Sequence, residues 1–165
     1  MDSSRPVLPI SCITLVSLAF LFCSVPTHVS AQQTKPDLSG TWKLKASKSK
    51  LDEHRYHSDE RRIRHSEPRL VIVYTLPVSS ETYSYVTDGE ERVVNSSQQN
   101  GVTRAKAYWD GDTLVIEGRN DRLGGSWVAH YTLSQDGRSL VVAQHFNKSS
   151  FSPAFDELLT FEKRK

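Results

Sequence analysis

Cysteine is scarce in this sequence, which has two in 165 residues, Cys12 and Cys23. Both lie in a 31-residue N-terminal segment that we expect to be removed from the mature chain. Residues 32–165 contain none, which excludes disulfide bonds and thiol chemistry there, even in an oxidising compartment. These 134 residues suffice for one packed core and are too few for two ordinary domains.

Hydrophobic runs of membrane-spanning length are also absent. The longest, residues 10–25, is interrupted by polar residues, whereas a spanning helix needs about 20 mainly apolar ones. It follows Arg5 and precedes Val29-Ser30-Ala31, a pattern typical of a signal-peptidase site. We therefore expect a signal peptide over 1–31, cleaved after Ala31, and a secreted or periplasmic protein without a membrane partner. An uncleaved anchor is the alternative.

The chain lacks an excess of charge of one sign. It has 21 Lys and Arg against 19 Asp and Glu, a formal net charge of +2. A nucleic-acid partner is not expected, because such proteins usually gather many basic side chains on one face. Residues 61–64 and 163–165 are locally basic, and we interpret both as solvated strand ends. The sequence does not specify an oligomeric state.

No stretch of the mature chain has the apolar spacing of a core-facing helix. Short β-rich runs instead alternate with turn residues, including the pairs Asp88-Gly89, Asp110-Gly111 and Asp136-Gly137. Asp-Gly readily adopts the positive backbone angles of tight hairpins. Ten antiparallel strands are predicted, over residues 40–46, 61–65, 69–76, 81–87, 90–95, 102–109, 113–119, 126–133, 139–147 and 155–163. The charged stretch 46–60 is predicted to be a loop or a short polar helix.

The hairpins predict strand pairs. Two-residue turns at Asp110-Gly111 and Asp136-Gly137 pair Ala107 with Leu114, and Trp127 with Phe146. Both place an apolar face inward, and this assignment of faces does not change if a turn is longer. The expected core is Trp109, Leu114, Ile116, Trp127, Tyr131, Leu140, Val142 and Phe146.

Ten short antiparallel strands leave exposed edges unless they close on themselves. We therefore predict an all-β fold, a single up-and-down barrel of about ten strands over residues 38–165, preceded by a flexible lead-in over 32–37. Small inward-facing residues such as Ala105, Ala129 and Gly118 make room for large neighbours or leave a cavity.

The first and last strands carry a family resemblance. Asp37-Leu38-Ser39-Gly40-Thr41-Trp42 resembles the Gly-x-Trp motif of lipocalins and fatty-acid-binding proteins, the calycins. With Ala46-Ser47-Lys48-Ser49 and the run 109–114, the chain is most similar to secreted bacterial lipocalin-like domains of unknown function. The resemblance implies a calycin-like barrel closed at one end by Gly40 and Trp42, with Lys163 or Arg164 packed across the indole by cation–π contact.

A barrel of this kind suggests a non-enzymatic protein that binds a small apolar or amphipathic molecule between its strands. The residues predicted to line such a site are Tyr83, Tyr85, Arg92, Trp109, Trp127, Tyr131, Gln144 and Phe146. One alternative is that these side chains fill the interior, leaving a structural or protein-interaction module.

A second alternative is a metal-dependent or enzymatic module that uses the segment His54–His65. His54 and His57 stand three residues apart, and His65 or a nearby carboxylate could complete a zinc site. The His-Glu-x-x-His spacing, a nucleophile elbow and a phosphate-binding loop are all missing. We therefore predict no cofactor and favour a protein that is not an enzyme.

Overall fold

The computed structural model describes residues 34–52, 57–98, 100–122, 124–149 and 152–164. All ten predicted strands are present, and every end lies within two residues of its predicted limit. They are β1 (Gly40–Leu44), β2 (Glu60–Ser66), β3 (Arg69–Thr75), β4 (Ser80–Val86), β5 (Arg92–Ser97), β6 (Gly101–Asp110), β7 (Thr113–Asn120), β8 (Gly125–Leu133), β9 (Ser139–Phe146) and β10 (Phe155–Lys163). Within the described ranges, no helix is both long enough and apolar enough to cross a membrane.

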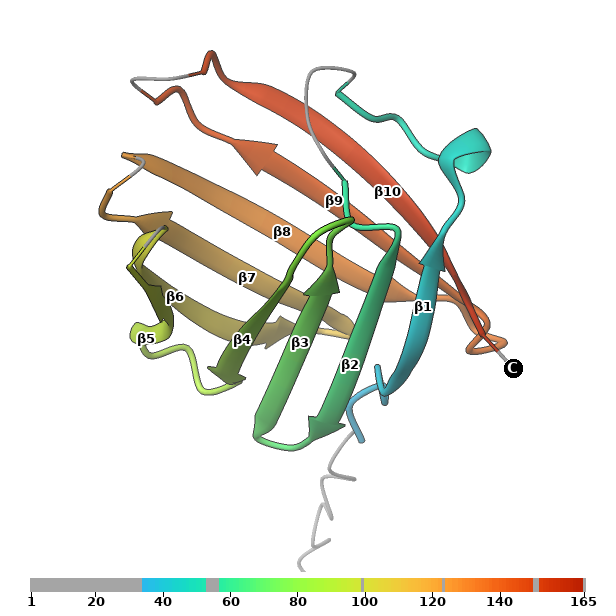
Figure 1. Ribbon diagram of the computed structural model, residues 1–165. Coiled ribbons are helices and arrows are strands. Elements are labelled where there is room, and N and C mark those ends of the chain that lie inside the picture. The colour runs from blue at the N-terminus through green and yellow to red at the C-terminus, as the bar shows by residue number, and fades with distance from the viewer. Residues whose placement is uncertain (1–33, 53–56, 99, 123, 150–151, 165) are drawn as a thin grey trace, which may run out of the picture. The chain divides into compact units, whose positions relative to one another are not determined.

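The strands form one antiparallel sheet that curls into a nearly closed up-and-down barrel, as predicted. Their order is β4-β3-β2-β1-β10-β9-β8-β7-β6-β5, so the first strand pairs with the last and β4 and β5 are the two edges. Figure 1 shows β1 to β4 crossing in front of β7 to β10, with the interior between these two walls. Asn95 on β5 donates a hydrogen bond from Nδ2 to the Thr82 carbonyl of β4 across the remaining gap, at 2.8 Å.

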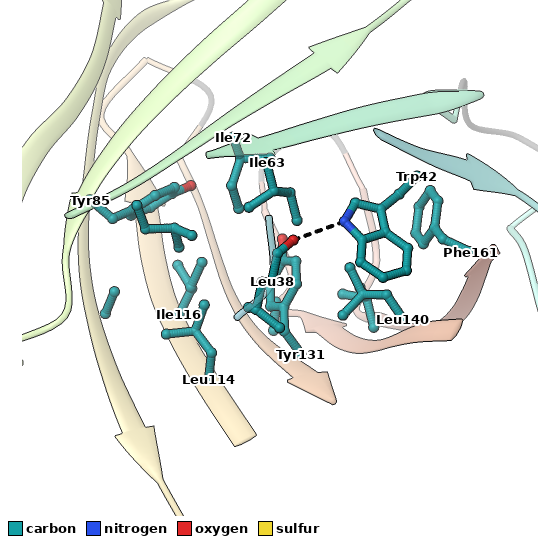
Figure 2. Close-up of a cluster of buried hydrophobic side chains, with 14 of the residues drawn as sticks. Leu38, Trp42, Ile63, Ile72, Tyr85, Leu114, Ile116, Tyr131, Leu140 and Phe161 are labelled. Atoms are coloured by element: carbon teal, nitrogen blue, oxygen red, sulfur yellow. Dashed lines mark hydrogen bonds between the residues drawn. The ribbon is translucent and has the colours of Figure 1, made fainter. Parts of the chain in front are cut away.

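The side chains alternate between the two sides of each strand. On β6, Thr103, Ala105 and Ala107 are buried while their neighbours are partly exposed, because successive residues of a strand point to opposite faces. The inward-facing apolar side chains meet at one end of the barrel, where Figure 2 shows Leu38 among residues of several strands. Of the expected core, five residues are fully buried there: Leu114, Ile116, Tyr131, Leu140 and Val142.

Of the two predicted hairpin registers, one is confirmed and one is wrong. The β8–β9 pairing is confirmed, with Trp127 opposite Phe146 and Tyr131 opposite Val142. The β6–β7 register is wrong by two residues, because Ala107 lies opposite Ile116 instead of Leu114. The turn is centred on Gly111-Asp112, with Asp110 paired to Thr113 and Gly111 at φ 57°. A shift of two residues keeps the same faces inward, so the predicted apolar face is unchanged.

The charged stretch between β1 and β2 begins with a short 3-10 helix, η1 (Ala46–Lys48), in agreement with the predicted loop or short helix. Lys50 then forms an isolated bridge with Leu158 on β10. The described residues of this segment therefore run beside β10 at Leu158. They lie on the side of the barrel away from the buried cluster.

Candidate ligand-binding cavity

A cavity of about 970 Å³ occupies the barrel interior. It lies between the buried cluster and the opposite end of the barrel, where the turns after β3, β5 and β9 contribute residues to its lining. Pockets that bind small molecules typically enclose about 300–1,000 Å³. The alternative in which side chains fill the interior is therefore wrong for this half of the barrel.

Six of the eight residues predicted to face a ligand line this cavity: Tyr83, Tyr85, Trp127, Tyr131, Gln144 and Phe146. Phe155, Phe146 and Trp127 are cross-strand neighbours and form an aromatic row across β10, β9 and β8. The Phe155 and Phe146 rings stack with centroids 4.5 Å apart. These rings provide an extended apolar wall at the outer half of the cavity.

Gly118 determines the position of one of these rings. It lies opposite Trp127, and a Cβ atom at this position would come within 2.7 Å of Trp127 Cε2. Real Cβ atoms do not approach that closely, so the absent side chain leaves space that the indole occupies. The role for Gly118 considered from the sequence, making room for a large neighbour, is the one found.

Arg92 and Trp109 do not line the cavity, contrary to prediction. The Arg92 guanidinium is 38% exposed and binds Asp88 and Glu90 at the β4–β5 turn. Its place at the very start of β5, beside two acidic turn residues, explains why it faces solvent. Trp109 is half-buried at the closed end of the barrel, where Nε1 donates to Glu67.

Arg61 is the main interior residue that sequence reasoning missed. The basic run 61–64 was interpreted as solvated, but Arg61 is only 5% exposed and lines the cavity. Its Cζ lies 4.9 Å from the Tyr74 ring centroid and 4.6 Å from that of Phe161. Arg61 and Ile63 share the inward face of β2, so the two-residue alternation around the buried Ile63 was the signal available.

A pair of tyrosines, Tyr74 and Tyr131, lies beside this guanidinium. Arg61 Nη1 donates to Tyr131 Oη at 3.4 Å, and the Tyr131 and Tyr74 hydroxyl oxygens are 3.1 Å apart. Burial raises the pKa of Tyr131 and of Tyr85 well above the ordinary value. Both hydroxyls therefore stay protonated at neutral pH and remain able to donate hydrogen bonds.

A second polar cluster lies nearer the mouth. The Glu157 carboxylate on β10 is buried, and it accepts hydrogen bonds from Gln144 Nε2 at 2.5 Å and from the Asp52 backbone N–H at 3.2 Å. His57 Nε2 lies 2.5 Å from Glu157 Oε1. These contacts attach the segment before β2 to the cavity wall.

The opposite end is closed by the residues that the calycin resemblance implied. Trp42 is fully buried, and its Nε1 donates to the Leu38 carbonyl at 2.9 Å. Of the two candidate cations, Lys163 lies over the indole, with Nζ 5.2 Å from the ring centroid. Arg164 instead donates to Glu60 on the surface. Gly40 leaves space for the Lys163 chain, because a Cβ there would lie 2.6 Å from Lys163 Cε.

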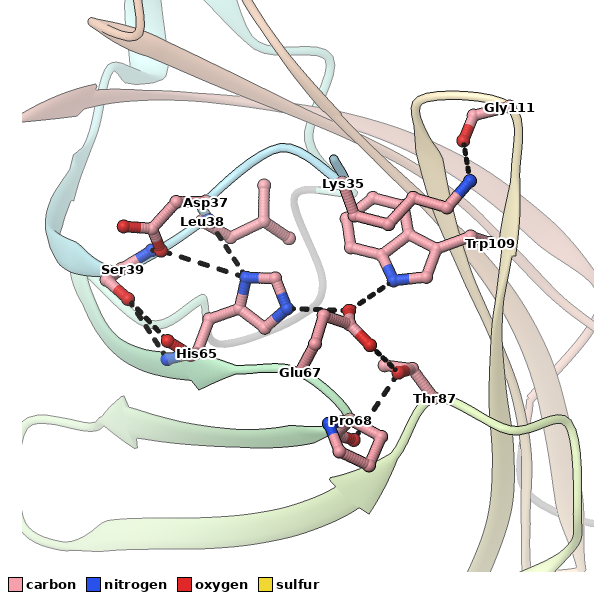
Figure 3. A network of polar contacts seen from close by, with 10 residues as sticks. All are labelled: Lys35, Asp37, Leu38, Ser39, His65, Glu67, Pro68, Thr87, Trp109 and Gly111. Atoms are coloured by element: carbon pink, nitrogen blue, oxygen red, sulfur yellow. Dashed lines mark hydrogen bonds and ion pairs between the residues drawn. The ribbon is translucent and has the colours of Figure 1, made fainter. Parts of the chain in front are cut away.

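A polar network holds the lead-in over this end, as Figure 3 shows. His65 accepts from the Leu38 N–H at 3.4 Å and contacts Glu67 at 2.8 Å through Nε2. Glu67 also accepts from Thr87 and Trp109. Burial alone would raise the pKa of Glu67, but the hydrogen bonds from Thr87, His65 and Trp109 hold it below the ordinary value.

The candidate metal ligands are not brought together. His57 contacts Glu157 at the mouth, His65 contacts Glu67 at the closed end, and most of β2 separates them. His54 lies outside the described residues. Within the described ranges, no three His, Cys, Asp or Glu side chains are grouped so that they could hold a metal ion.

Of three comparisons with known proteins, the one with solved structures gives a match, and it shows the fold alone. No protein-family model matches the sequence, and no curated protein does. Among solved structures, the barrel is similar to human cRBP IV, a cellular retinol-binding protein, at a TM-score of 0.55. The match covers 78% of this chain and 99% of that one, at 16% sequence identity. The chain therefore has a calycin-like fold, as the sequence resemblance implied.

Proposed function

We propose that this protein is a secreted, non-enzymatic carrier or receptor that binds a small apolar or amphipathic molecule inside its barrel. The observation that carries the proposal is the cavity of about 970 Å³, which is lined at its outer half by the aromatic row and at its inner half by Tyr74 and Tyr131. Its wall combines apolar surface with a few polar groups, which is the usual composition of a small-molecule site.

The fold supports the same conclusion. The name of human cRBP IV denotes binding of retinol, an apolar molecule with one polar end, by a barrel of similar topology. A shared fold does not transfer a ligand, because one barrel hosts many functions. The residues of this cavity, described above, are therefore the basis for the ligand class.

Export is proposed from the sequence. The apolar run 10–25 and the small residues before Gln32 are typical of a cleaved signal peptide. The mature chain would then meet its ligand outside the cytoplasm. Mass measurement of the protein purified from its host tests this proposal, and a chain that still begins at Met1 would contradict it.

Native mass spectrometry tests ligand binding directly. The protein purified from its host, or exposed to a total lipid extract of that host, should carry a bound small molecule. Ala129 lines the cavity, so Ala129→Phe should fill part of it and reduce occupancy about tenfold or more. Ala143→Phe is the matched control, because Ala143 lies on β9 opposite the exposed His130, on the outer face.

Two results would contradict the proposal. One is that the wild-type protein carries nothing from either source. The other is that Ala129→Phe, still folded by circular dichroism, retains the same molecule as fully as the control does.

A further inference from the structure

Aromatic rings line two opposite walls of the cavity. One wall carries the aromatic row, with Phe146 of β9 at its centre. Tyr83 and Tyr85 line the cavity from β4. In the strand order, β9 is five strands from β4 in either direction round the barrel, so these two strands lie opposite each other. A ligand in the cavity therefore has aromatic rings on two sides.

The rings within each wall are nearly parallel. The ring planes of Phe146 and Phe155 differ by 14°, and those of Tyr83 and Tyr85 by 12°. Aromatic pairs gain energy from offset stacking and edge-to-face contact beyond the area that they bury. A flat ring system can make such contacts with both walls at once, whereas an alkyl chain gains burial alone. The walls therefore favour a flat aromatic ligand over a flexible chain.

Glu81 supplies an anchor for a polar group beside these tyrosines. Its Oε1 accepts from Asn100 Nδ2 at 2.7 Å, and its Oε2 accepts from the Tyr83 hydroxyl at 2.8 Å. A carboxylate has about four acceptor sites, so each oxygen can accept from one more donor. Both present donors are neutral, and in the part of the chain that the structure describes no cationic side chain forms an ion pair with Glu81.

The charges around the cavity favour a donor at this anchor. Arg61 is the one lysine or arginine among the described lining residues. It lies opposite Tyr74, which lies opposite Glu81, so two strand spacings, about 10 Å, separate the backbones of Arg61 and Glu81. Asp52 and Glu157 also line the cavity and add negative charge. An N–H group, above all a positively charged one, is therefore attracted to Glu81, and a carboxylate is repelled.

From this arrangement we propose that the ligand is a flat aromatic amine, a ring system with at least one N–H donor. It binds between the aromatic row and the two β4 tyrosines and donates its N–H to Glu81. This inference rests on the proposed function and specifies the ligand class of the same cavity.

Three probes test the shape and the polar group separately. Proflavine is a flat three-ring cation with amino groups, anthracene carboxylate is a flat three-ring anion, and dodecylamine is a flexible cation. Each is titrated into the mature protein by isothermal titration calorimetry at neutral pH. The wild-type protein should bind proflavine about tenfold or more tightly than either of the other two.

Glu81→Gln keeps the size of the side chain and removes its charge. It should weaken proflavine binding about fivefold or more and should not weaken the binding of anthracene carboxylate. Glu90→Gln is the matched control. It removes the same charge from a side chain that is 74% exposed at the β4–β5 turn, so no affinity should change.

Phe146→Leu keeps an apolar side chain and removes the central ring of the aromatic row. It should weaken the binding of both three-ring probes about threefold or more and change dodecylamine binding by less than about twofold. Circular dichroism shows whether each variant is folded. If either variant fails to fold, the ratios of the wild-type affinities decide.

The outcomes separate this inference from the proposed function. The flat aromatic amine is overturned if dodecylamine or anthracene carboxylate binds as tightly as proflavine, or if folded Glu81→Gln or Phe146→Leu binds proflavine as the wild type does. It is also overturned if the protein takes up a host lipid and none of the three probes. In each of these cases the binding function stands. Failure to bind any probe or any molecule from the host extract overturns the binding function, and this inference with it.

Discussion

At the scale of single residues, Glu67 connects separate parts of the chain at the closed end. It contacts His65 on β2, accepts from Thr87 after β4 and accepts from Trp109 on β6. His65 in turn contacts Asp37 of the lead-in, with 3.7 Å between Nδ1 and Oδ1, and accepts from the N–H of Leu38, the residue that follows the lead-in. The lead-in is thus attached by hydrogen bonds to charged and polar groups as well as by apolar contact.

Glu67→Gln should lower the free energy of unfolding by about 1 kcal/mol at pH 7, because the hydrogen bonds to a charged acceptor become weaker. The pKa of Glu67 lies below its ordinary value in the folded protein. Its contribution is therefore complete above the unfolded pKa, about 4.3, and is lost as the pH falls through the lower folded value.

Urea unfolding of both proteins between pH 7 and pH 3 measures this effect. The difference between them should shrink as the pH falls below about 4. Glu90→Gln, at an exposed turn, serves as the control. A difference that is constant with pH would show that the Glu67 charge does not stabilise the fold.

Some residues of the candidate site could be predicted from the sequence, and others could not. Aromatic residues on the inward face, such as Trp127 and Phe146, were placed correctly because the strand alternation fixes their side. Arg61 was not, because a charged run is usually solvated and its neighbours Arg62 and Arg64 are in fact exposed. The alternation with Ile63 places Arg61, the first residue of that run, on the inward face, but the usual solvation of charged runs outweighed this signal.

At the scale of elements, the strands were predictable because each is short, alternating and bounded by turn residues. The turns themselves were less so. Asp-Gly can place glycine first or second in a two-residue loop, and the choice moves the register by two residues. At β6–β7 glycine comes first, with Gly111 at φ 57°. The β8–β9 loop is symmetric about Asp136-Gly137, so the simplest assumption gave the correct pairs.

The gap between β4 and β5 leads to a prediction about backbone protection. Amides of these edge strands that face the gap lack a ladder partner, so they should exchange with solvent faster than the amides of β8, which pairs on both sides. Asn95→Ala removes the side-chain bond to the Thr82 carbonyl and should speed exchange in β4 further.

Hydrogen–deuterium exchange measured by mass spectrometry checks this, with peptides of β8 as the internal control. The Asn95→Ala variant should leave the β8 peptides unchanged. Equal protection of β4, β5 and β8 in the wild-type protein would mean that the gap is closed in solution.

At the scale of the whole molecule, the division into a packed end and a hollow end could not be predicted from the sequence. Small residues face inward along the full length of the barrel, including Ala107 at the packed end and Ala129 at the cavity. Local patterns cannot distinguish them, because the space beside each depends on side chains from strands far away in the sequence. Leu38 shows this most clearly, since it fills the packed end from outside any strand.

Leu38→Ala should therefore destabilise the whole barrel by about 2–5 kcal/mol, the range for truncating a fully buried leucine. Chemical unfolding followed by tryptophan fluorescence measures the change. Leu158→Ala is the matched control, because Leu158 is 41% exposed on β10, and surface changes usually stay within about 0.5 kcal/mol. Equal small effects would show that Leu38 is not part of the cooperative core.

The pairing of β1 with β10 determines when the cavity can form during synthesis and folding. Trp42 lies opposite Lys163, so the ten-stranded sheet is complete only after residue 163 has been synthesised. Until then there is no enclosed cavity, although the hairpins between can already form. Under the export and ligand binding proposed above, the chain crosses a membrane as an extended polypeptide, so it arrives empty and takes up its ligand in the compartment where it folds.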